Sequence, residues 1–257
     1  MICAMSDIHG CLEPLKTALG RVDLTGGSRL VLCGDYIDYG EESGQVLRFL
    51  YELQQSQGED KVIVLRGNHE EMLLEWLGTF REGYMGVPDS SGFVPWSEWL
   101  DTDVDYRTFR TLVTPTQFRA FERALPSLSD TSQNIEAARM VRAASGELIR
   151  WLRRLPYYYE TERQIYVHAG VDEQAGEYWK WGTGAETFAW KHPATTGKFY
   201  KDVIAGHIGT ARLAGDPNFH GVWNDGKSHW YIDGTVRRSG RIPVLAYNEE
   251  TGEYKER

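Results

Sequence analysis

The sequence lacks any apolar run near the length of about 18 residues that a membrane-spanning helix needs. It has only three cysteines, all within the first 33 residues and without the spacing of a small disulfide scaffold. The first five residues resemble a core strand, because no basic region and no apolar leader segment precede them. We therefore expect a cytoplasmic protein with reduced cysteines and no membrane partner.

Clusters of basic residues are also missing. The chain carries 28 Lys and Arg against 37 Asp and Glu, with a formal net charge of −9. Nonspecific nucleic-acid binding needs a basic surface that neutralises phosphates, so we expect no nucleic-acid partner. An anionic substrate would need a local positive centre, for which bound metal ions are an efficient source.

The sequence does have the composition of an ordinary soluble domain. Its 257 residues are 41% hydrophobic and 25% charged, which allows a substantial core. No internal repeat or low-complexity segment is visible. We therefore predict a single domain over residues 1–257.

Strands and helices alternate through the first part of the chain. Residues 2–5, 28–32 and 61–65 have the pattern of buried strands. Residues 12–19 and 45–53 carry apolar side chains at helical spacing. This order of strand, helix, strand, helix and strand predicts a parallel sheet with right-handed crossovers.

Each of these strands ends in polar side chains that suit metal binding or catalysis. They are Asp7 and His9 after the first strand, Asp35 and Asp38 after the second, and Asn68 and His69 after the third. Open α/β sheets place their ligands at the carboxyl ends of parallel strands, so these side chains should converge. One residue separates Asp7 from His9, which in an extended segment puts both on the same face. The alternative is that Asp7 caps the helix that begins near Leu12.

Residues 83–144 break the alternation and indicate a helical insertion. A loop rich in Pro, Gly and Ser over 88–95 precedes helical stretches around 109–125 and 135–144. The insertion also contains several aromatic residues, including Trp99. These aromatics either form the insertion's own small core or belong to a lid that selects substrates above the site.

The second half of the chain twice repeats the pattern of a strand that ends in a histidine beside glycine. Residues 164–167 lead to His168, which Ala169 and Gly170 follow. Residues 203–205 lead to Gly206 and His207. Both histidines are therefore candidates for the same site as the earlier strand-end residues.

Shorter elements are predicted around these histidines. Ser145 can cap a helix with apolar residues up to Leu155, and residues 157–159 form a short strand. The tail, at 229–232 and 243–248, has the pattern of short antiparallel strands. We expect these tail strands to finish a second sheet.

The strand-end residues form a metal-ligand set without thiolate. The candidate ligands are Asp7, His9, Asp35, Asn68, His168 and His207. Carboxylate, amide and imidazole groups suit Mn, Fe, Zn, Ni or Co ions better than a closed structural zinc site. Asp35 could bridge two such ions about 3.5–4 Å apart, the arrangement of two-metal phosphate-ester hydrolases. We expect two divalent ions, with Mn as the first choice.

Five motifs stand in the order of a known enzyme family. They are Asp7-x-His9, Gly34-Asp35-x-x-Asp38-x-Gly40, Arg66-Gly67-Asn68-His69-Glu70, His168-Ala169-Gly170 and Gly206-His207. With them the sequence resembles the calcineurin-like metallophosphoesterases, and within these the phosphoprotein phosphatase branch. That branch comprises serine/threonine phosphatases, bacterial and phage enzymes, and symmetrical dinucleoside tetraphosphatases. The resemblance implies an α/β fold of two mixed sheets, packed as a sandwich and flanked by helices.

The resemblance also implies a role for each strand-end residue. Two overlapping metal sites would be bound by Asp7, His9 and Asp35, and by Asp35, Asn68, His168 and His207. His69, oriented by Asp38, would be the general acid that protonates the leaving alkoxide. A histidine with a carboxylate partner suits this role, because the carboxylate fixes the tautomer and supports the protonated form.

The chain departs from the family's pattern where phosphate is bound. The family's Gly-Asp-x-x-Asp-Arg-Gly motif has a phosphate-clamping arginine, and Tyr39 stands in its place. A phenol cannot supply the charged bidentate fork of a guanidinium. A second arginine of the family's pattern is replaced near Trp190, where Lys191 follows. The candidate substrate-binding side chains are then Arg66, Asn68, Tyr39 and Lys191, although Arg66 could equally be a structural ion-pair partner.

The expected activity is hydrolysis of phosphate monoesters by attack of a metal-bound hydroxide. The substrate would be phosphoserine or phosphothreonine in a protein, or a small phosphorylated molecule. An alternative is a symmetrical dinucleoside tetraphosphatase, which uses the same core with a different substrate groove. A further alternative is a non-catalytic metal-dependent binding module, motivated by Tyr39, although the presence of His69 and Asp38 favours catalysis.

Overall fold

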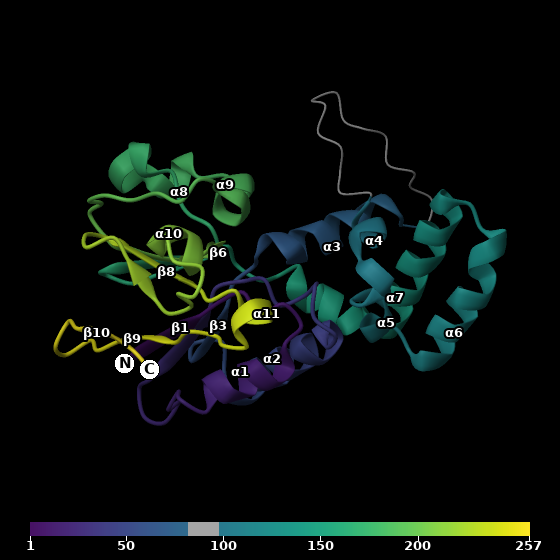
Figure 1. Ribbon diagram of the computed structural model, residues 1–257, viewed down its shortest axis with the longest axis horizontal. Coiled ribbons are helices and arrows are strands. Elements are labelled where there is room, and N and C mark those ends of the chain that lie inside the picture. Colours follow the sequence, from purple (N-terminus) through teal and green to yellow (C-terminus); the bar gives the residue numbers. More distant parts are fainter. Residues whose placement is uncertain (82–97) are drawn as a thin grey trace.

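The structure is a computed structural model that describes residues 1–81 and 98–257. Its centre consists of two five-stranded mixed sheets (Figure 1). The first sheet has the order β10 (Tyr254–Glu256), β9 (Leu245–Tyr247), β1 (Ile2–Met5), β2 (Arg29–Leu32) and β3 (Val62–Val64). The second has the order β4 (Tyr158–Glu160), β5 (Gln164–Val167), β6 (Asp202–Gly209), β8 (His229–Asp233) and β7 (Trp223–Asn224). The predicted α/β fold with two mixed sheets is confirmed.

The parallel start of the chain is also confirmed. β1 pairs in parallel with β2, and β2 pairs in parallel with β3. The helices α1 (Leu12–Leu19) and α2 (Ser43–Gln57) connect these strands. In the second sheet, β5, β6 and β8 are parallel. Each sheet therefore has three neighbouring strands whose carboxyl ends lie at the same edge of that sheet.

The expectation that the whole tail finishes the second sheet is wrong. Only β8 lies in that sheet, where it pairs in parallel with β6. β9 instead pairs antiparallel with β1 in the first sheet, and β10 pairs antiparallel with β9. A period-2 pattern identifies a strand but not its partner, and β1 has one side that β2 leaves free. The tail therefore covers an edge that the sequence alone did not reveal.

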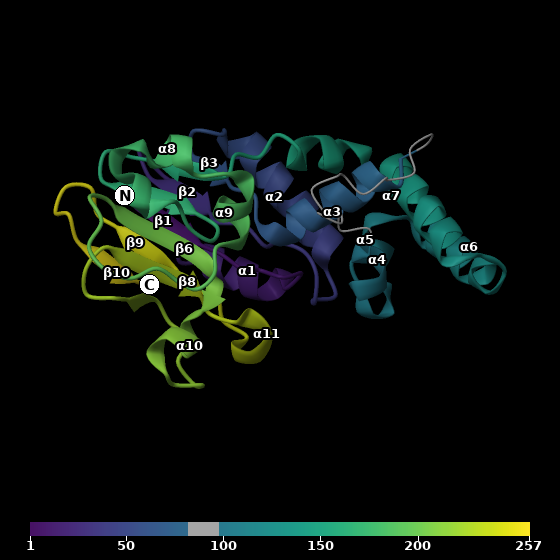
Figure 2. The ribbon, with the colours of Figure 1, turned by 90° about the horizontal axis from the view of Figure 1, so that it is seen from above.

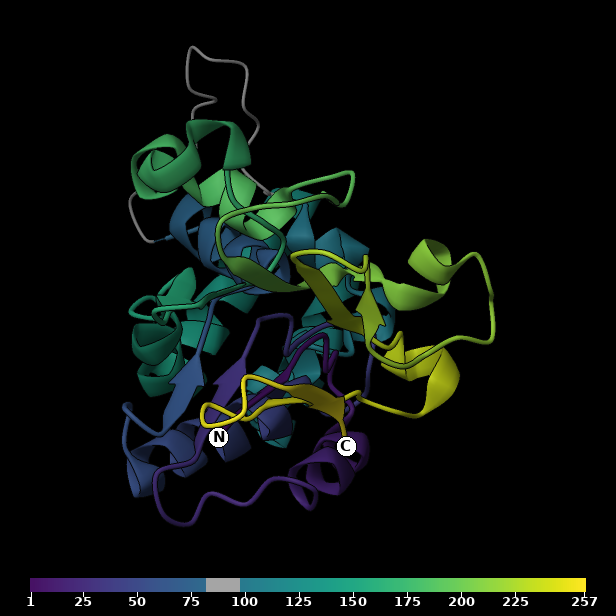
Figure 3. The same cartoon turned by 90° about the vertical axis from the view of Figure 1, so that its left-hand side faces the viewer.

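Alternating side chains divide the core into layers. From β1, Ile2 and Ala4 lie in the apolar cluster between the two sheets. Cys3 and Met5 lie in the cluster under the first sheet, between that sheet and its helices. This is the two-residue period of a strand that is buried on both faces. The sheets lie one above the other in Figure 3, with the N-terminal strands and the yellow β9 and β10 below the green strands.

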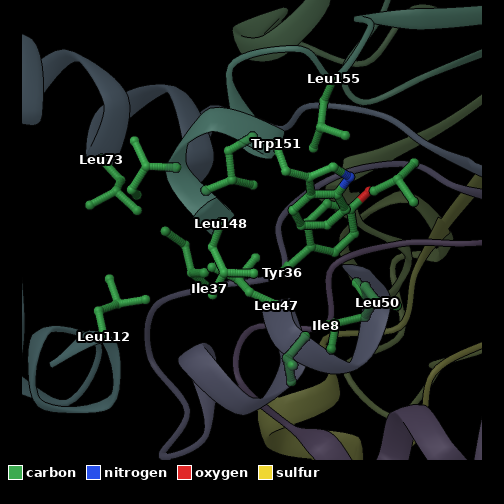
Figure 4. Close-up of a cluster of buried hydrophobic side chains, with 14 of the residues drawn as sticks. Ile8, Tyr36, Ile37, Leu47, Leu50, Leu73, Leu112, Leu148, Trp151 and Leu155 are labelled. Carbon is green, nitrogen blue, oxygen red and sulfur yellow. The ribbon is translucent and has the colours of Figure 1, made fainter. Parts of the chain in front are cut away.

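Helices cover both outer faces of this sandwich. α1, α2, α3 (Asn68–Thr79) and α7 (Asp130–Leu152) bury apolar side chains in the cluster under the first sheet (Figure 4). On the other side, Trp179 of α8 (Trp179–Gly182) and Phe188 of α9 (Ala185–Trp190) pack on the second sheet. Three shorter elements lie near the sheet edges: the 3-10 helix η3 (Glu173–Tyr178), α10 (Thr210–Ala214) and α11 (Val236–Ser239).

The described part of the predicted insertion is helical. It contains α4 (Trp99–Thr102), η1 (Val104–Tyr106), α5 (Phe109–Leu112), α6 (Pro115–Ala124), η2 (Leu125–Ser127) and most of α7. These elements project away from the sheets in Figure 2, yet Trp99, Phe109 and Phe121 are buried in the same apolar cluster as Met5. These aromatics are therefore core residues, but of a cluster shared with the first sheet and not of a separate small core of the insertion. The loop predicted over 88–95 lies outside the described residues.

The long helix α7 contains Ser145, the predicted cap residue. α7 is kinked at Ser145, whose φ of −123° and ψ of 24° are not helical, so that one helical stretch ends there and the predicted one follows it. The hydroxyl of Ser145 donates to the carbonyl of Leu112 at 2.5 Å. Within the described ranges, we find no helix with the length and apolar character to span a membrane. The assignment of residues 1–257 to one domain stays a prediction.

Candidate metal centre

The predicted strand-end side chains meet at one edge of the sandwich. Asp7, Asp35 and Asn68 follow the carboxyl ends of β1, β2 and β3, while His168 and His207 come from the ends of β5 and β6. The site contains two groups of potential ligand atoms, and within each group all the atoms lie within 4.8 Å of one another. The first group comes from His9, Asp35 and His69, and the second from Asp35, His168 and His207. Both groups contain Asp35, so the geometry has the shared carboxylate that a two-ion site needs.

Asp35 lies at the middle of this constellation. Its Oδ2 atom is 3.4 Å from His168 Nε2 and 3.8 Å from His9 Nε2. Its Oδ1 atom accepts a hydrogen bond from the backbone N–H of His69 at 3.1 Å. The side chain is almost fully buried. Although burial favours the neutral acid, the surrounding His168, His69 and His9 hold the pKa of Asp35 below its usual range.

Backbone carbonyls orient two of the imidazoles. His168 Nδ1 lies 2.8 Å from the carbonyl oxygen of Cys33, and His9 Nδ1 lies 3.0 Å from that of Ile37. Each Nδ1–H therefore donates to a carbonyl, which leaves the Nε2 lone pair directed into the cluster. His168 Nε2 then lies 2.8 Å from Asn68 Oδ1, so two acceptor atoms face each other. A cation coordinated by both atoms would satisfy this arrangement.

The charge state of the imidazoles also suits metal binding. Burial lowers the pKa of His9 and of His168, and burial together with His168 lowers the pKa of His207 to about 4. Neutral imidazoles keep the lone pair that a metal ion requires. Burial raises the pKa of Asp7, and the neighbouring Asp233 and Asp35 raise it further. A bound cation would relieve this repulsion, so the donor set fits divalent metal ions.

His69 and Asp38 form the predicted pair. Nδ1 of His69 lies 2.8 Å from Oδ2 of Asp38, and both side chains are buried. Burial lowers the pKa of His69, but Asp35 and Asp38 outweigh it and raise this pKa to about 9. Trp99 donates its indole N–H to the same Asp38 oxygen at 3.1 Å. The insertion therefore reaches the site through Trp99, one of the aromatic residues for which the sequence analysis left both a core role and a lid role open.

Glu70 organises the loops that carry the ligands, a role that the sequence analysis missed. One carboxylate oxygen accepts from the N–H groups of Asp35 and Gly67, both at 3.0 Å. The other accepts from those of Tyr36, at 2.8 Å, and Ile37, at 3.3 Å. A fully buried carboxylate thus joins the loop after β2 to the start of α3. Its position three residues after Gly67, as in a capping box, was the available signal.

We expect Glu70→Gln to lower the free energy of unfolding by about 2–4 kcal/mol, because an amide can accept on one side only and leaves two buried N–H groups unpaired. Urea unfolding followed by circular dichroism measures this loss. The control is Glu52→Gln, an exposed change on α2 that should leave the midpoint unaltered. An unchanged midpoint for Glu70→Gln would contradict the bridging role.

Strained backbone conformations concentrate at this site. Among the described non-glycine residues, nine have positive φ, and six of them belong to the site: Asp7, His9, Asp35, Asp38, Tyr39 and His207. The expectation of an extended segment from Asp7 to His9 is therefore wrong, with φ values of 54° and 44°. Such residues cost about 1–3 kcal/mol each and persist only where surrounding contacts hold them. Asp7 caps no helix either, since its carboxylate accepts the His207 N–H and Cys11 precedes α1.

Two hollows lie beside the candidate metal centre. One has a volume of about 380 Å³ and is lined by His69 and Arg107 among others. The second has a volume of about 500 Å³ and includes His9 in its wall. Tyr39 and Arg237 line both hollows, so this pair stands between them. Two separate hollows therefore adjoin the cluster of candidate ligands.

Most of the chain matches one known protein family. A sequence model described as calcineurin-like phosphoesterase matches residues 1–237. The chain belongs to the calcineurin-like phosphoesterase family. The predicted resemblance is thereby confirmed, and membership places the chain among the phosphoric ester hydrolases, a metal-dependent family.

Relatives in this family are named symmetrical bis(5'-nucleosyl)-tetraphosphatases. The chain is 43% identical to one from Pseudomonas putida over 72 residues, which cover 28% of this chain and 23% of the relative. It is 34% identical to one from Azotobacter vinelandii over 108 residues, which cover 38% of this chain and 37% of the relative. The match therefore spans just under a quarter to just over a third of the relatives' length.

Solved structures agree on the fold of the family. A crystal structure provisionally assigned as a diadenosine tetraphosphatase is 16% identical, with a TM-score of 0.53 over 100% of this chain and 92% of that one. A cold-active protein-tyrosine phosphatase from a Shewanella species is 17% identical, with a TM-score of 0.54 over 99% of this chain and 79% of that one. At these identities the likeness supports the fold.

In this phosphoesterase, two predicted substrate-binding side chains are occupied by other contacts. Arg66 pairs with Glu71, with 2.7 Å between Nη1 and Oε1, and also donates to the carbonyl of Arg153. Lys191 donates to the carbonyl of Val171 at 2.5 Å and lies 3.5 Å from Glu173. These contacts favour structural roles for both. Of the remaining candidates, Asn68 faces His168 as described above, and Tyr39 is half exposed between the hollows.

Proposed function

We propose that this phosphoesterase is a symmetrical dinucleoside tetraphosphatase, which cleaves a dinucleoside polyphosphate in the middle of its phosphate chain. The observation that carries the proposal is the name shared by the relatives, at 34–43% identity over the matched segments. This activity was the alternative in the sequence analysis, and the relatives favour it over the phosphomonoester hydrolysis that was expected first.

The shape of the site supports a substrate with two arms. The hollows of about 380 and 500 Å³ flank Tyr39 and border His69 and His9 respectively. Each volume lies within the range of about 300–1,000 Å³ that is usual for small-ligand pockets. A nucleoside on each side of the reacting phosphoryl would use both hollows, whereas a small phosphomonoester would use at most one.

Two divalent ions, with Mn as first choice, complete the proposed site. Their proposed ligands are Asp7, His9, Asp35, Asn68, His168 and His207, with Asp35 shared. Bound there, the ions would polarise the phosphoryl oxygens and lower the pKa of a water molecule to supply the nucleophile. The chain's own part is to hold the ligands deprotonated and oriented, through the Cys33 and Ile37 carbonyls and the burial of the imidazoles.

His69 is the proposed proton donor to the leaving group. Its Nδ1 atom is committed to Asp38, so Nε2 is the atom that can give a proton. Nε2 lies 3.9 Å from Asp35 Oδ2, which places it at the inner side of the cluster. Asp38, held by Trp99, fixes the ring and stabilises its protonated form.

The deciding experiment compares substrates with one Mn²⁺-loaded preparation. Diadenosine tetraphosphate, a phosphoserine peptide and p-nitrophenyl phosphate are assayed in parallel, and nucleotide products are separated by ion exchange. We expect ADP as the nucleotide product and a kcat/KM for diadenosine tetraphosphate at least about 100-fold above that for the peptide, because the second nucleotide adds contacts that the peptide lacks.

Other outcomes lead to different conclusions. Formation of ATP and AMP would contradict symmetrical cleavage, and a preference for the phosphopeptide would restore the protein-phosphatase hypothesis. Absence of turnover with all three substrates, in protein shown to contain metal, would favour a binding module. Protein stripped with EDTA and reloaded serves as the control for metal dependence.

A further inference from the structure

Arg237 holds a positive charge beside the candidate metal centre. It lies on α11, and its guanidinium carbon is 5.5 Å from the centre of the Tyr39 ring. That ring packs edge-on against His69, with 5.0 Å between ring centres, and against His9, with 4.9 Å. Stacking on an aromatic face leaves the in-plane N–H donors of a guanidinium available. The Tyr39 ring therefore contacts Arg237 as well as both histidines.

No acidic side chain in the described ranges forms an ion pair with Arg237. The residue is exposed, and its guanidinium contacts the Tyr39 ring. Arg107, which lines the same hollow, differs because it forms ion pairs with Glu41 at 3.2 Å and Asp105 at 3.5 Å. A guanidinium on the wall of a pocket, without a carboxylate partner among the described residues, is a strong binding group for phosphate oxygens.

Arg237 makes no hydrogen bond or ion pair with a candidate metal ligand within the described ranges. The Tyr39 ring contacts both the guanidinium and the two histidines. An anion on Arg237 is therefore free to differ from a phosphoryl held by the metal ions. Because Arg237 borders both hollows, it would contact the next phosphoryl group along the substrate's polyphosphate chain, whichever hollow that part of the substrate enters. A monoester has no such second phosphoryl group.

We propose that Arg237 binds the phosphoryl group adjacent to the one that is cleaved, and so selects polyphosphate chains over monoesters. This inference deepens the proposed function and rests on it for the identity of the substrate. Tyr39, which occupies the position of a clamping arginine, then has a definite role, since its ring is the platform that holds the guanidinium of Arg237 in place.

The test compares a ligand with two phosphoryl groups and a ligand with one. Methylenediphosphonate and orthophosphate are titrated calorimetrically into Mn²⁺-loaded wild type, Arg237→Ala and Arg237→Lys. For Arg237→Ala we expect methylenediphosphonate affinity to fall about tenfold or more, the usual weight of a charged hydrogen bond, and orthophosphate affinity to change less than about twofold. Arg237→Lys, which keeps the charge but not the planar fork, should lie between.

Arg123→Ala is the matched control. It removes the same charge from an exposed position on α6, far from α11 in Figures 1 and 2, and should alter neither affinity. Unchanged methylenediphosphonate affinity in Arg237→Ala would overturn the proposal, as would an equal loss for both ligands. If wild type fails to cleave diadenosine tetraphosphate while Arg237→Ala still loses methylenediphosphonate affinity, only the proposed function fails.

Discussion

Replacement of His69 by asparagine should lower kcat for phenyl phosphate by about 100- to 10,000-fold, the range that general acid catalysis supplies. The phenolate leaving group is strongly basic and needs a proton as its bond to phosphorus breaks. The amide of an asparagine cannot provide one, whereas the imidazole of His69, paired with Asp38, can. Steady-state kinetics measure the loss, and elemental analysis should show the same metal content as in wild type.

The leaving group supplies the internal control for this variant. With p-nitrophenyl phosphate the departing phenol is more acidic and depends less on a proton donor, so the loss in kcat should be clearly smaller. Equal losses with both esters would contradict the acid role and point to a positioning role instead. Asp38→Asn should weaken turnover less than His69→Asn, because the imidazole is still present without its carboxylate partner.

Asp35→Asn should release both metal ions and abolish turnover. Asp35 belongs to both groups of ligand atoms, and its Oδ2 faces His9, His69 and His168. A neutral amide offers one oxygen without charge. Mutation of a residue that only hydrogen-bonds to a metal ligand lowers metal affinity by about 10–100-fold. Because Asp35 is itself a proposed ligand, we expect its replacement to lower metal affinity by more than about 100-fold. Metal content after equilibration with Mn²⁺ and gel filtration measures the stoichiometry.

His207→Gln is the comparison for this experiment. His207 lies in only one of the two ligand groups, so this variant should lose one ion and keep the other. A wild-type stoichiometry in Asp35→Asn would contradict the shared-ligand hypothesis. Simultaneous loss of both ions in His207→Gln would show that the two sites are not separable in the way proposed.

The local part of this fold was predictable from the sequence. Residues 2–5, 29–32 and 62–64 form strands where β-branched and apolar runs indicated them, with polar side chains at their carboxyl ends. That convergence follows from the parallel arrangement, which a strand, helix and strand order requires. The long amphipathic helix α2 was also indicated, since its apolar spacing is a property of a short window of sequence.

Partners far apart in the chain were not predictable in the same way. The pairing of β9 with β1 joins segments near the two ends of the chain, and no local pattern specifies it. For Trp99 the sequence could not decide between a core role and a lid role, because its bond to Asp38 depends on how the insertion folds back. The left-handed backbone at Asp7 and Asp35 was hidden for another reason: those conformations oppose local preference and exist only in the assembled site.

The hydrogen bond from the His207 N–H to the carboxylate of Asp7 spans 200 residues, and that from His168 Nδ1 to the carbonyl of Cys33 spans 135. Contacts between such distant segments close large loops and form late in folding. During synthesis, ligands before residue 70 would therefore leave the ribosome long before their partners on the second sheet. The full set of candidate metal ligands would be available only after His207 has emerged, and the strands β7, β8, β9 and β10 would still have to join the two sheets after it.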